Sequence, residues 1–102
     1  MEKEFIPYEQ ALALKELGFD ELCLMYYDYS WTLVESGVYE CKAPLYQQCF
    51  RWFREKHDLH CNIDPWGYCI FDDNGTEKTG FESYEEAELE CLKKLIEIVK
   101  QK

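Results

Sequence analysis

Three stretches of the chain have the residue patterns of helices, and in two of them apolar residues recur at helical spacing. The first covers residues 8–17, which are rich in helix formers. It is followed by Gly18, which suits the left-handed position after a helix, and by Phe19, which can then contact Leu14. The second follows Pro44, and its apolar side chains fall within an arc of about 160°: Leu45, Tyr46, Cys49, Phe50, Trp52, Phe53 and His57. Both patterns predict a helix, and the second predicts one with a buried face.

The third stretch has the clearest helix start. Ser83 stands three residues before Glu86, which is the spacing of a capping box. Acidic residues crowd the first half of this helix and lysines the second half, as the helix dipole favours. Its apolar stripe is broad enough that it could also bind a second copy of the chain, and it comprises Tyr84, Ala87, Cys91, Leu92, Leu95, Ile96, Ile98 and Val99.

Short apolar runs between the helices predict strands. Aromatic and β-branched residues favour a hairpin over residues 22–34 that turns at Asp28-Tyr29-Ser30. Residues 38–43 are ambiguous. Asp72-Asp73-Asn74-Gly75 is a strong turn signal, because Asn and Gly accept positive φ. Three further strands are predicted around it, over residues 59–63, 66–71 and 76–81.

The element order α-β-β-α-β-β-β-α predicts an α+β fold. We expect one domain over residues 1–102, in which an antiparallel sheet of about four to five short strands packs against three helices. Residues 44–100 alone follow the helix, three strands, helix order of the double-stranded RNA-binding domain. The basic helix start that such domains place on phosphates is replaced here by Ser83-Tyr84-Glu85-Glu86. The similar order therefore does not imply an RNA-binding function.

Charge excludes several classes of partner. The chain has 21 acidic and 11 basic residues, and residues 1–40 hold nine carboxylates against two lysines. Nucleic acids and anionic lipids require clustered Lys and Arg, but an acidic residue interrupts the single basic cluster of Arg51, Arg54 and Lys56. No apolar run approaches the roughly 20 residues of a membrane span, and Met1-Glu2-Lys3-Glu4 does not open a secretory signal. We expect a cytoplasmic protein that binds neither nucleic acid nor a membrane.

Cysteine and histidine are the candidate chemical groups. The six cysteines have no C-x-x-C spacing, and free thiols are the cytosolic default. A metal site of His57, His60, Cys61 and Cys69 is disfavoured, because adjacent residues on a strand point to opposite faces. A catalytic Cys61 would need His57 or His60 as its base, whereas His57 suits a packed or capping role better. We therefore expect no metal, no cofactor and no catalysis.

The favoured function is a non-catalytic protein-interaction or accessory module, with a protein partner or a second copy. Aromatic side chains are enriched at interfaces, although in a short chain they also build the core. The candidate contact surface comprises Tyr26, Tyr27, Tyr29, Trp31 and Trp66. Two alternatives stay open. One is an acidic decoy that occupies a nucleic-acid-binding protein, which needs carboxylates aligned on one face. The other is the enzyme based on cysteine and histidine.

Three stretches of the sequence also carry a resemblance. They read PYEQALALKELGFD over residues 7–20, PLYQQCFRWFREK over residues 44–56 and YEEAELECLKKLIE over residues 84–97. They resemble small uncharacterised proteins of Bacteroides-like gut bacteria and their phages. The resemblance covers about half of the chain and implies a bacterial or phage cytoplasmic setting. It brings no known activity and therefore no catalytic residue.

Overall fold

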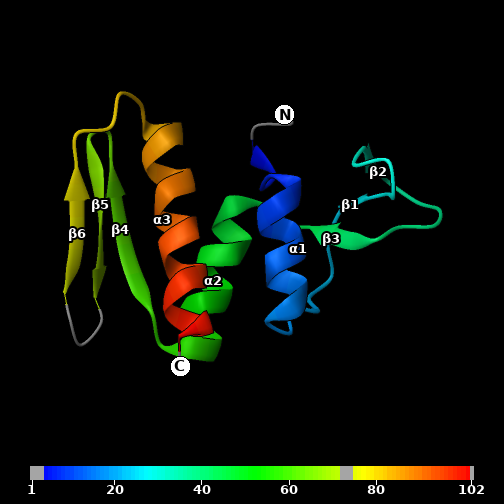
Figure 1. The fold of residues 1–102 in the computed structure, drawn as a ribbon, viewed down its shortest axis with the longest axis horizontal. Coiled ribbons are helices and arrows are strands. Elements are labelled where there is room, and N and C mark those ends of the chain that lie inside the picture. The colour runs from blue at the N-terminus through cyan, green and yellow to red at the C-terminus, as the bar shows by residue number, and fades with distance from the viewer. Residues whose placement is uncertain (1–3, 72–74, 102) are drawn as a thin grey trace. The chain divides into compact units, whose positions relative to one another are not determined.

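The computed structural model describes residues 4–71 and 75–101, which form two compact units (Figure 1). We call Met1–Gln48 the N-terminal unit and Cys49–Lys102 the C-terminal unit. The division falls within the helix α2 (Tyr46–His57). The α+β class is confirmed, and the predicted element order holds with one strand added, β3 (Cys41–Ala43), in the segment that the sequence left ambiguous.

The helix α1 (Tyr8–Glu16) ends as its sequence predicts. Gly18 has a φ of 97°, which a side chain would disfavour. The N–H of Phe19 donates to the carbonyl of Leu14 at 3.0 Å, and that of Gly18 to the carbonyl of Lys15 at 3.1 Å. These two bonds make the Schellman motif. Pro7 is the N-cap residue with a ψ of 158°, and the helical residues begin directly after it.

The N-terminal unit contains the first of two sheets. Strands β1 (Met25–Tyr27), β2 (Leu33–Val34) and β3 are antiparallel and lie in the order β2-β1-β3. The predicted hairpin is therefore confirmed, but its paired part is short, with Tyr26 opposite Val34 and Tyr27 opposite Leu33. Helix α1 contacts β3.

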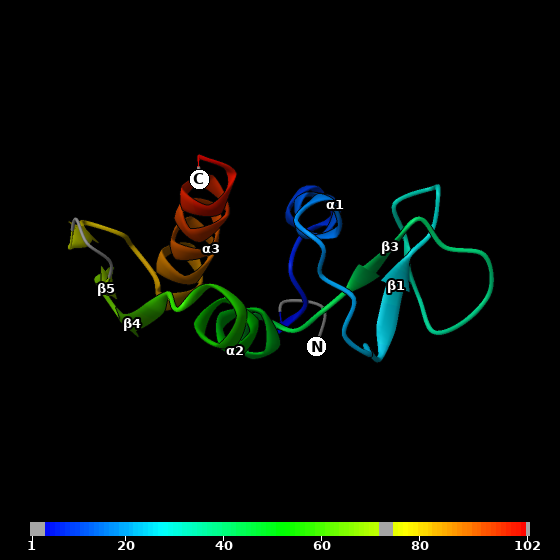
Figure 2. The ribbon, with the colours of Figure 1, turned by 90° about the horizontal axis from the view of Figure 1, so that it is seen from below.

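The C-terminal unit contains the second sheet. Strands β4 (His60–Asp64), β5 (Gly67–Phe71) and β6 (Thr76–Thr79) are antiparallel and lie in the order β4-β5-β6. Helix α3 (Tyr84–Lys100) packs against β4 and β5 from one side of this sheet (Figure 2). Asp72, Asp73 and Asn74 of the predicted turn lie outside the described residues.

The prediction of one sheet of four to five strands is wrong, because the strands divide into two sheets of three. The physical reason is local pairing. Both edges of β1 are occupied by β2 and β3, which lie close in the sequence, and both edges of β5 are occupied by β4 and β6. Each central strand thus satisfies its backbone donors and acceptors with its neighbours in sequence.

The apolar stripe of α3 supplies much of the buried surface in the C-terminal unit. Its buried members lie in the middle of the helix: Ala87, Cys91, Leu92, Leu95 and Ile96. Tyr84 is exposed, and Ile98 and Val99 are partly exposed, so the stripe is less buried towards both ends. Opposite the helix, Tyr68 and Ile70 of β5 are buried. Within the described residues, no helix combines the length and apolarity needed to cross a membrane.

The cap of α3 gives a first testable expectation. The hydroxyl oxygen of Ser83 accepts a hydrogen bond from the N–H of Glu86 at 3.2 Å. Ser83→Ala leaves this donor without its cap, so we expect the free energy of unfolding to fall by about 1 kcal/mol. Urea unfolding followed by circular dichroism measures the loss. Ser36→Ala, in the exposed segment between β2 and β3, is the control and should change stability little. Equal stability of the two variants would contradict the capping role.

Candidate functional site

The five aromatic residues predicted to form a contact surface differ in their exposure. Tyr29 and Trp31 expose 66% and 68% of their surface in the N-terminal unit, and Trp66 exposes 71% in the C-terminal unit. Tyr26 is half-buried and stacks on Tyr39, with 4.3 Å between ring centroids. Tyr27 differs from the prediction because it is buried, and its hydroxyl donates to the carbonyl of Ile6 at 2.7 Å. The structure thus keeps Tyr29 and Trp31 together on one exposed turn.

That turn runs from Asp28 to Thr32 and is held by four hydrogen bonds. One carboxylate oxygen of Asp28 accepts from the N–H groups of Ser30 at 2.8 Å and Thr32 at 3.0 Å. The N–H of Trp31 donates to the carbonyl of Asp28 at 2.9 Å, and the N–H of Asp28 donates to the carbonyl of Thr32 at 3.0 Å. Trp31 and Thr32 therefore belong to the turn, although the sequence predicts them in the second strand of the hairpin. Of that strand, Leu33 and Val34 pair with β1.

Trp31 has a backbone conformation that bulky side chains rarely adopt. Its φ is 66°, in the left-handed region that costs an L-residue roughly 1–2 kcal/mol. Strain of this kind tends to cluster at functional positions. An exposed tryptophan kept in a strained conformation by a hydrogen-bonded turn is the most distinctive surface feature of the N-terminal unit.

Tyr8 of α1 joins this turn to the rest of the N-terminal unit. Its ring lies 5.4 Å from that of Trp31 and 5.7 Å, edge-on, from that of Tyr27. Its hydroxyl donates a hydrogen bond to the carboxylate of Glu40, and this bond raises the pKa of Tyr8. We call Tyr8, Tyr29 and Trp31 the Trp31 surface. The sequence does not single out Tyr8, because helical spacing alone does not show which ring lies beside it.

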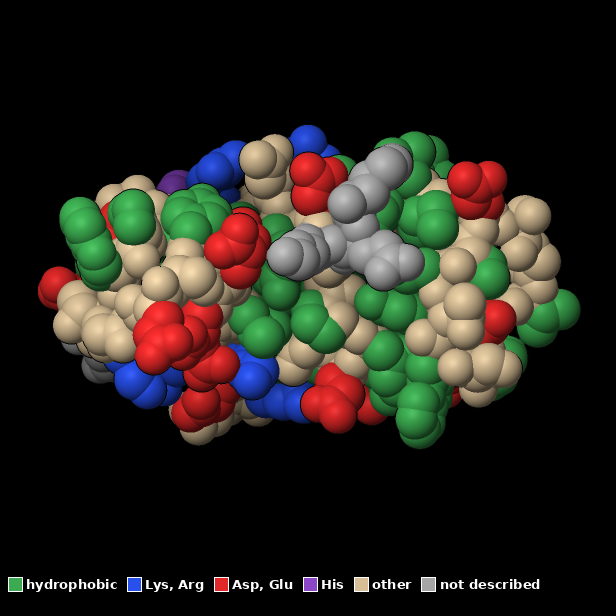
Figure 3. Space-filling model, turned by 90° about the horizontal axis from the view of Figure 1, so that it is seen from above, with side chains coloured by type: hydrophobic (Ala, Val, Ile, Leu, Met, Phe, Trp, Pro, Cys, Tyr) green, Lys and Arg blue, Asp and Glu red, His purple; other side chains and the backbone are tan. Residues whose placement is uncertain are grey.

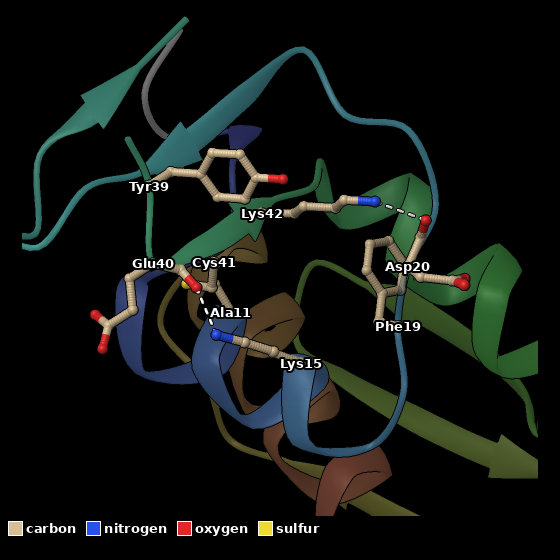
Figure 4. Close-up of a pocket in the computed structure, with 8 residues that line it drawn as sticks. All are labelled: Ala11, Lys15, Phe19, Asp20, Tyr39, Glu40, Cys41 and Lys42. Atoms are coloured by element: carbon tan, nitrogen blue, oxygen red, sulfur yellow. Dashed lines mark hydrogen bonds between the residues drawn. The ribbon is translucent and has the colours of Figure 1, made fainter. Parts of the chain in front are cut away.

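The N-terminal unit is strongly acidic. It holds nine carboxylates against three lysines, a net charge of −6. Its two described lysines reach across to backbone carbonyls (Figure 4): Lys15 donates to Glu40 at 2.7 Å and Lys42 to Asp20 at 2.6 Å. Figure 4 also shows the carboxylate of Glu40 directed away from these lysines. The unit therefore attracts cations.

The same two lysines border a cavity of about 380 Å³ in the N-terminal unit. Ala11, Phe19 and Cys41 are its buried apolar part. Burial, assisted by the charge of Glu40, raises the pKa of Cys41 to about 11. At neutral pH this thiol stays protonated and is a poor nucleophile. The cavity thus offers apolar contact and hydrogen bonds without an activated group among its lining residues.

In the C-terminal unit, the three residues of the candidate Cys/His site each have a different neighbour. The ring centroid of His57 lies 4.9 Å from that of Trp52 and 6.0 Å from that of Phe53, so this histidine packs against aromatic side chains. The Nε2 of His60 lies 3.1 Å from a carboxylate oxygen of Asp58. The thiol of Cys61 is close enough to the thiol of Cys91 that each shifts the pKa of the other. The structure therefore pairs Cys61 with a second thiol.

Acidic side chains also gather over the first turns of α3 (Figure 3). Glu82, Glu85 and Glu86 are exposed there, and burial raises the pKa of the neighbouring Glu88 carboxyl. Among residues 4–71 and 75–101, no group of three or more His, Cys, Asp or Glu side chains is placed to hold a metal ion. The carboxylates at the start of α3 stabilise the helix, because the helix dipole favours negative charge there.

The described geometry offers two kinds of chemistry, which lie in different units. The N-terminal unit presents exposed aromatic rings in an acidic field, which suits non-covalent binding. The C-terminal unit brings two thiols together. Neither a protein-family model, nor a curated protein, nor a solved structure matches this chain.

Proposed function

We propose that this chain is a non-catalytic protein-interaction module that binds a basic segment of a partner protein at the Trp31 surface. The observation that carries the proposal is Trp31 itself, which is 68% exposed and has a φ of 66°. The hydrophobic effect favours burial of a tryptophan side chain. Backbone sterics disfavour a φ in the left-handed region for an L-residue. A binding role accounts for both features, because an anchor residue must be exposed before its partner arrives.

The chemistry of the surface favours a basic partner. Lysine and arginine are attracted to the faces of tryptophan and tyrosine rings, by about 0.5–1 kcal/mol at exposed sites and more when water is excluded. The net charge of −6 on the N-terminal unit adds long-range attraction for the same side chains. The Asp28 turn and the ring of Tyr8 fix Trp31 before binding, which lowers the entropy cost of association.

The state of the thiols in the N-terminal unit supports a role without catalysis for that unit. Burial raises the pKa of both Cys23 and Cys41 to about 11, so both stay protonated at neutral pH. The alternative of an acidic decoy shares the basic partner but needs carboxylates in a row. It remains a separate prediction, and the experiment below distinguishes it, because a decoy would not depend on Trp31.

The test uses peptides selected for binding to the full chain from a random displayed library. We expect the selected peptides to be rich in Lys and Arg and to bind more weakly as salt rises. Trp31→Ala should weaken their binding at least tenfold, since anchor residues of this kind contribute more than about 1.4 kcal/mol. Isothermal titration calorimetry measures the change.

Trp66→Ala is the matched control, because it removes an equally exposed tryptophan from the C-terminal unit. It should leave the affinity for the selected peptides unchanged. Equal loss in both variants, or selected peptides without basic residues, would overturn the proposal. Sedimentation showing a dimer that Trp31→Ala dissociates would identify a second copy as the occupant and would also overturn it.

A further inference from the structure

Two cysteines far apart in the sequence lie on the facing sides of β4 and α3. Along β4, Cys61 and Ile63 are partly buried while His60, Asn62 and Asp64 are exposed, so Cys61 lies on the more buried face of the strand. Helix α3 packs against β4, and Cys91 lies fully buried in the middle of its apolar stripe. The packing of helix on sheet thereby brings the two thiols close enough that each shifts the pKa of the other.

We propose that Cys61 and Cys91 form a reversible disulfide within the chain when the protein meets a low-molecular-weight disulfide such as oxidised glutathione. Disulfide formation requires two sulfur atoms on neighbouring backbones that approach along compatible directions. The strand and the helix supply neighbouring backbones, and Cys61 and Cys91 lie on the faces that these two elements turn towards each other. This modification site is independent of the binding function proposed for the N-terminal unit.

The surroundings assign a different role to each sulfur. The hydrogen bond from Cys91 and the positive charge of Arg54 lower the pKa of Cys61, against the opposing effect of burial. The same hydrogen bond, together with burial, raises the pKa of Cys91. Cys61 is also the more exposed of the two. Because the thiolate is the attacking species, Cys61 reacts first with the external disulfide.

The reaction then balances in two exchange steps. The Cys61 thiolate attacks one sulfur of the small disulfide, forms a mixed disulfide and releases one small thiolate. In the mixed disulfide, Cys61 carries no negative charge. The interaction with Cys61 that raises the pKa of Cys91 is therefore lost. The Cys91 thiol gives up its proton and its thiolate attacks the Cys61 sulfur, which releases the second small thiolate. Two protein thiols are oxidised, one small disulfide is reduced to two thiols, and the two thiol protons end on these products.

The other four cysteines are less suited to form this disulfide. Cys69 lies on β5 opposite Asn62, so the pleat directs it to the other face of the sheet from Cys61. Cys41 and Cys49 are buried, and burial raises the pKa of Cys23 to about 11. Selective formation of the bond between Cys61 and Cys91 is therefore the expected result.

The experiment equilibrates the folded full chain with reduced and oxidised glutathione at several ratios. The products are alkylated, digested without reduction and mapped by mass spectrometry. We expect one dominant cross-linked peptide pair that joins Cys61 to Cys91, with two of the six thiols lost and all six restored by dithiothreitol. Absence of this pair in fully oxidising buffer, or a dominant bond between other cysteines, overturns the proposal.

Three variants test the order of events. Cys91→Ser should stop the reaction at a glutathione adduct on Cys61, and Cys61→Ser should leave Cys91 unmodified. Cys69→Ser is the matched control and should keep the Cys61–Cys91 bond. A glutathione adduct on Cys91 in the Cys61→Ser variant would overturn the assigned roles. Circular dichroism shows whether each variant folds, and if either of the first two does not, the mapping of the natural chain decides the outcome.

Discussion

Replacing Phe53 with alanine is expected to lower the free energy of unfolding by about 3–5 kcal/mol. The side chain of Phe53 is fully buried in the C-terminal unit, where its ring lies 5.0 Å from Trp52 and 6.0 Å from His57. Alanine leaves an empty space that these rings can fill only in part. Because small domains are stable by roughly 5–15 kcal/mol, the loss is a large share of the total. Urea unfolding at 25 °C measures it.

Phe71→Ala is the matched control for this substitution. Phe71 belongs to the same unit but exposes 59% of its surface, so its truncation removes little buried area. We expect a change within about 0.5 kcal/mol, as for other surface positions. If the two phenylalanine variants lost equal stability, burial would not explain the role of Phe53.

The second large effect is expected for Gly67→Ala. A Cβ atom at Gly67 would lie 2.2 Å from the carbonyl oxygen of Lys78 and 2.9 Å from the Cα of Thr79. Both atoms belong to the backbone of β6, which pairs with β5 at this position, with Gly67 opposite Thr79. The strands must separate to admit the methyl group. We expect a loss of at least about 3 kcal/mol, at the upper end of the cost of overpacking.

Gly75→Ala separates this steric effect from the general cost of replacing glycine. Gly75 has a φ of 63°, and a Cβ there would meet no atom within 4 Å. The expected cost is the conformational strain alone, about 1–2 kcal/mol. Thermal and urea unfolding of the two variants make the comparison. A Gly67→Ala variant as stable as Gly75→Ala would show that β6 moves away from β5 at little cost.

The helices were predictable because their signals are local. Gly18 marks the end of α1 and Ser83 the start of α3, and each works through backbone groups a few residues away. The buried stripe of α3 follows in the same way from spacing along one segment. These features depend little on what lies elsewhere in the chain, so the amino-acid order alone is enough to place them.

The sheets were harder because pairing depends on which strands meet. Turn signals and a weak alternation located β4, β5 and β6, although the predicted strand over residues 76–81 is longer than the observed Thr76–Thr79. These local signals carry no information on whether β1 pairs with β3 or with a strand beyond α2. The same limit explains Tyr27. In a strand of three residues the period of two cannot show which face is buried, and Tyr27 turned out to lie on the buried one.

The same difference between local signals and long-range packing applies to the candidate sites. Tyr29 and Trp31 follow a turn signal around Asp28 and were placed on a candidate surface from the sequence. The approach of Cys61 to Cys91 was not foreseen, because spacing along α3 made Cys91 equivalent to any small apolar residue. Only the packing of α3 on β4 brings the second sulfur beside the first.

In the sheet order β4-β5-β6 of the described residues, β6 is a border strand, and its sequence limits what can add to its outer edge. Glu77 and Lys78 place charges of both signs on a strand of only four residues, and Glu77, Lys78 and Thr79 are exposed. Short, charged border strands discourage a foreign strand from extending the ladder, which is how natural sheets resist growth into fibrils. The charges of β6 thus protect the C-terminal unit from aggregation through this strand. They do so at exposed positions, which lie outside the core of the unit.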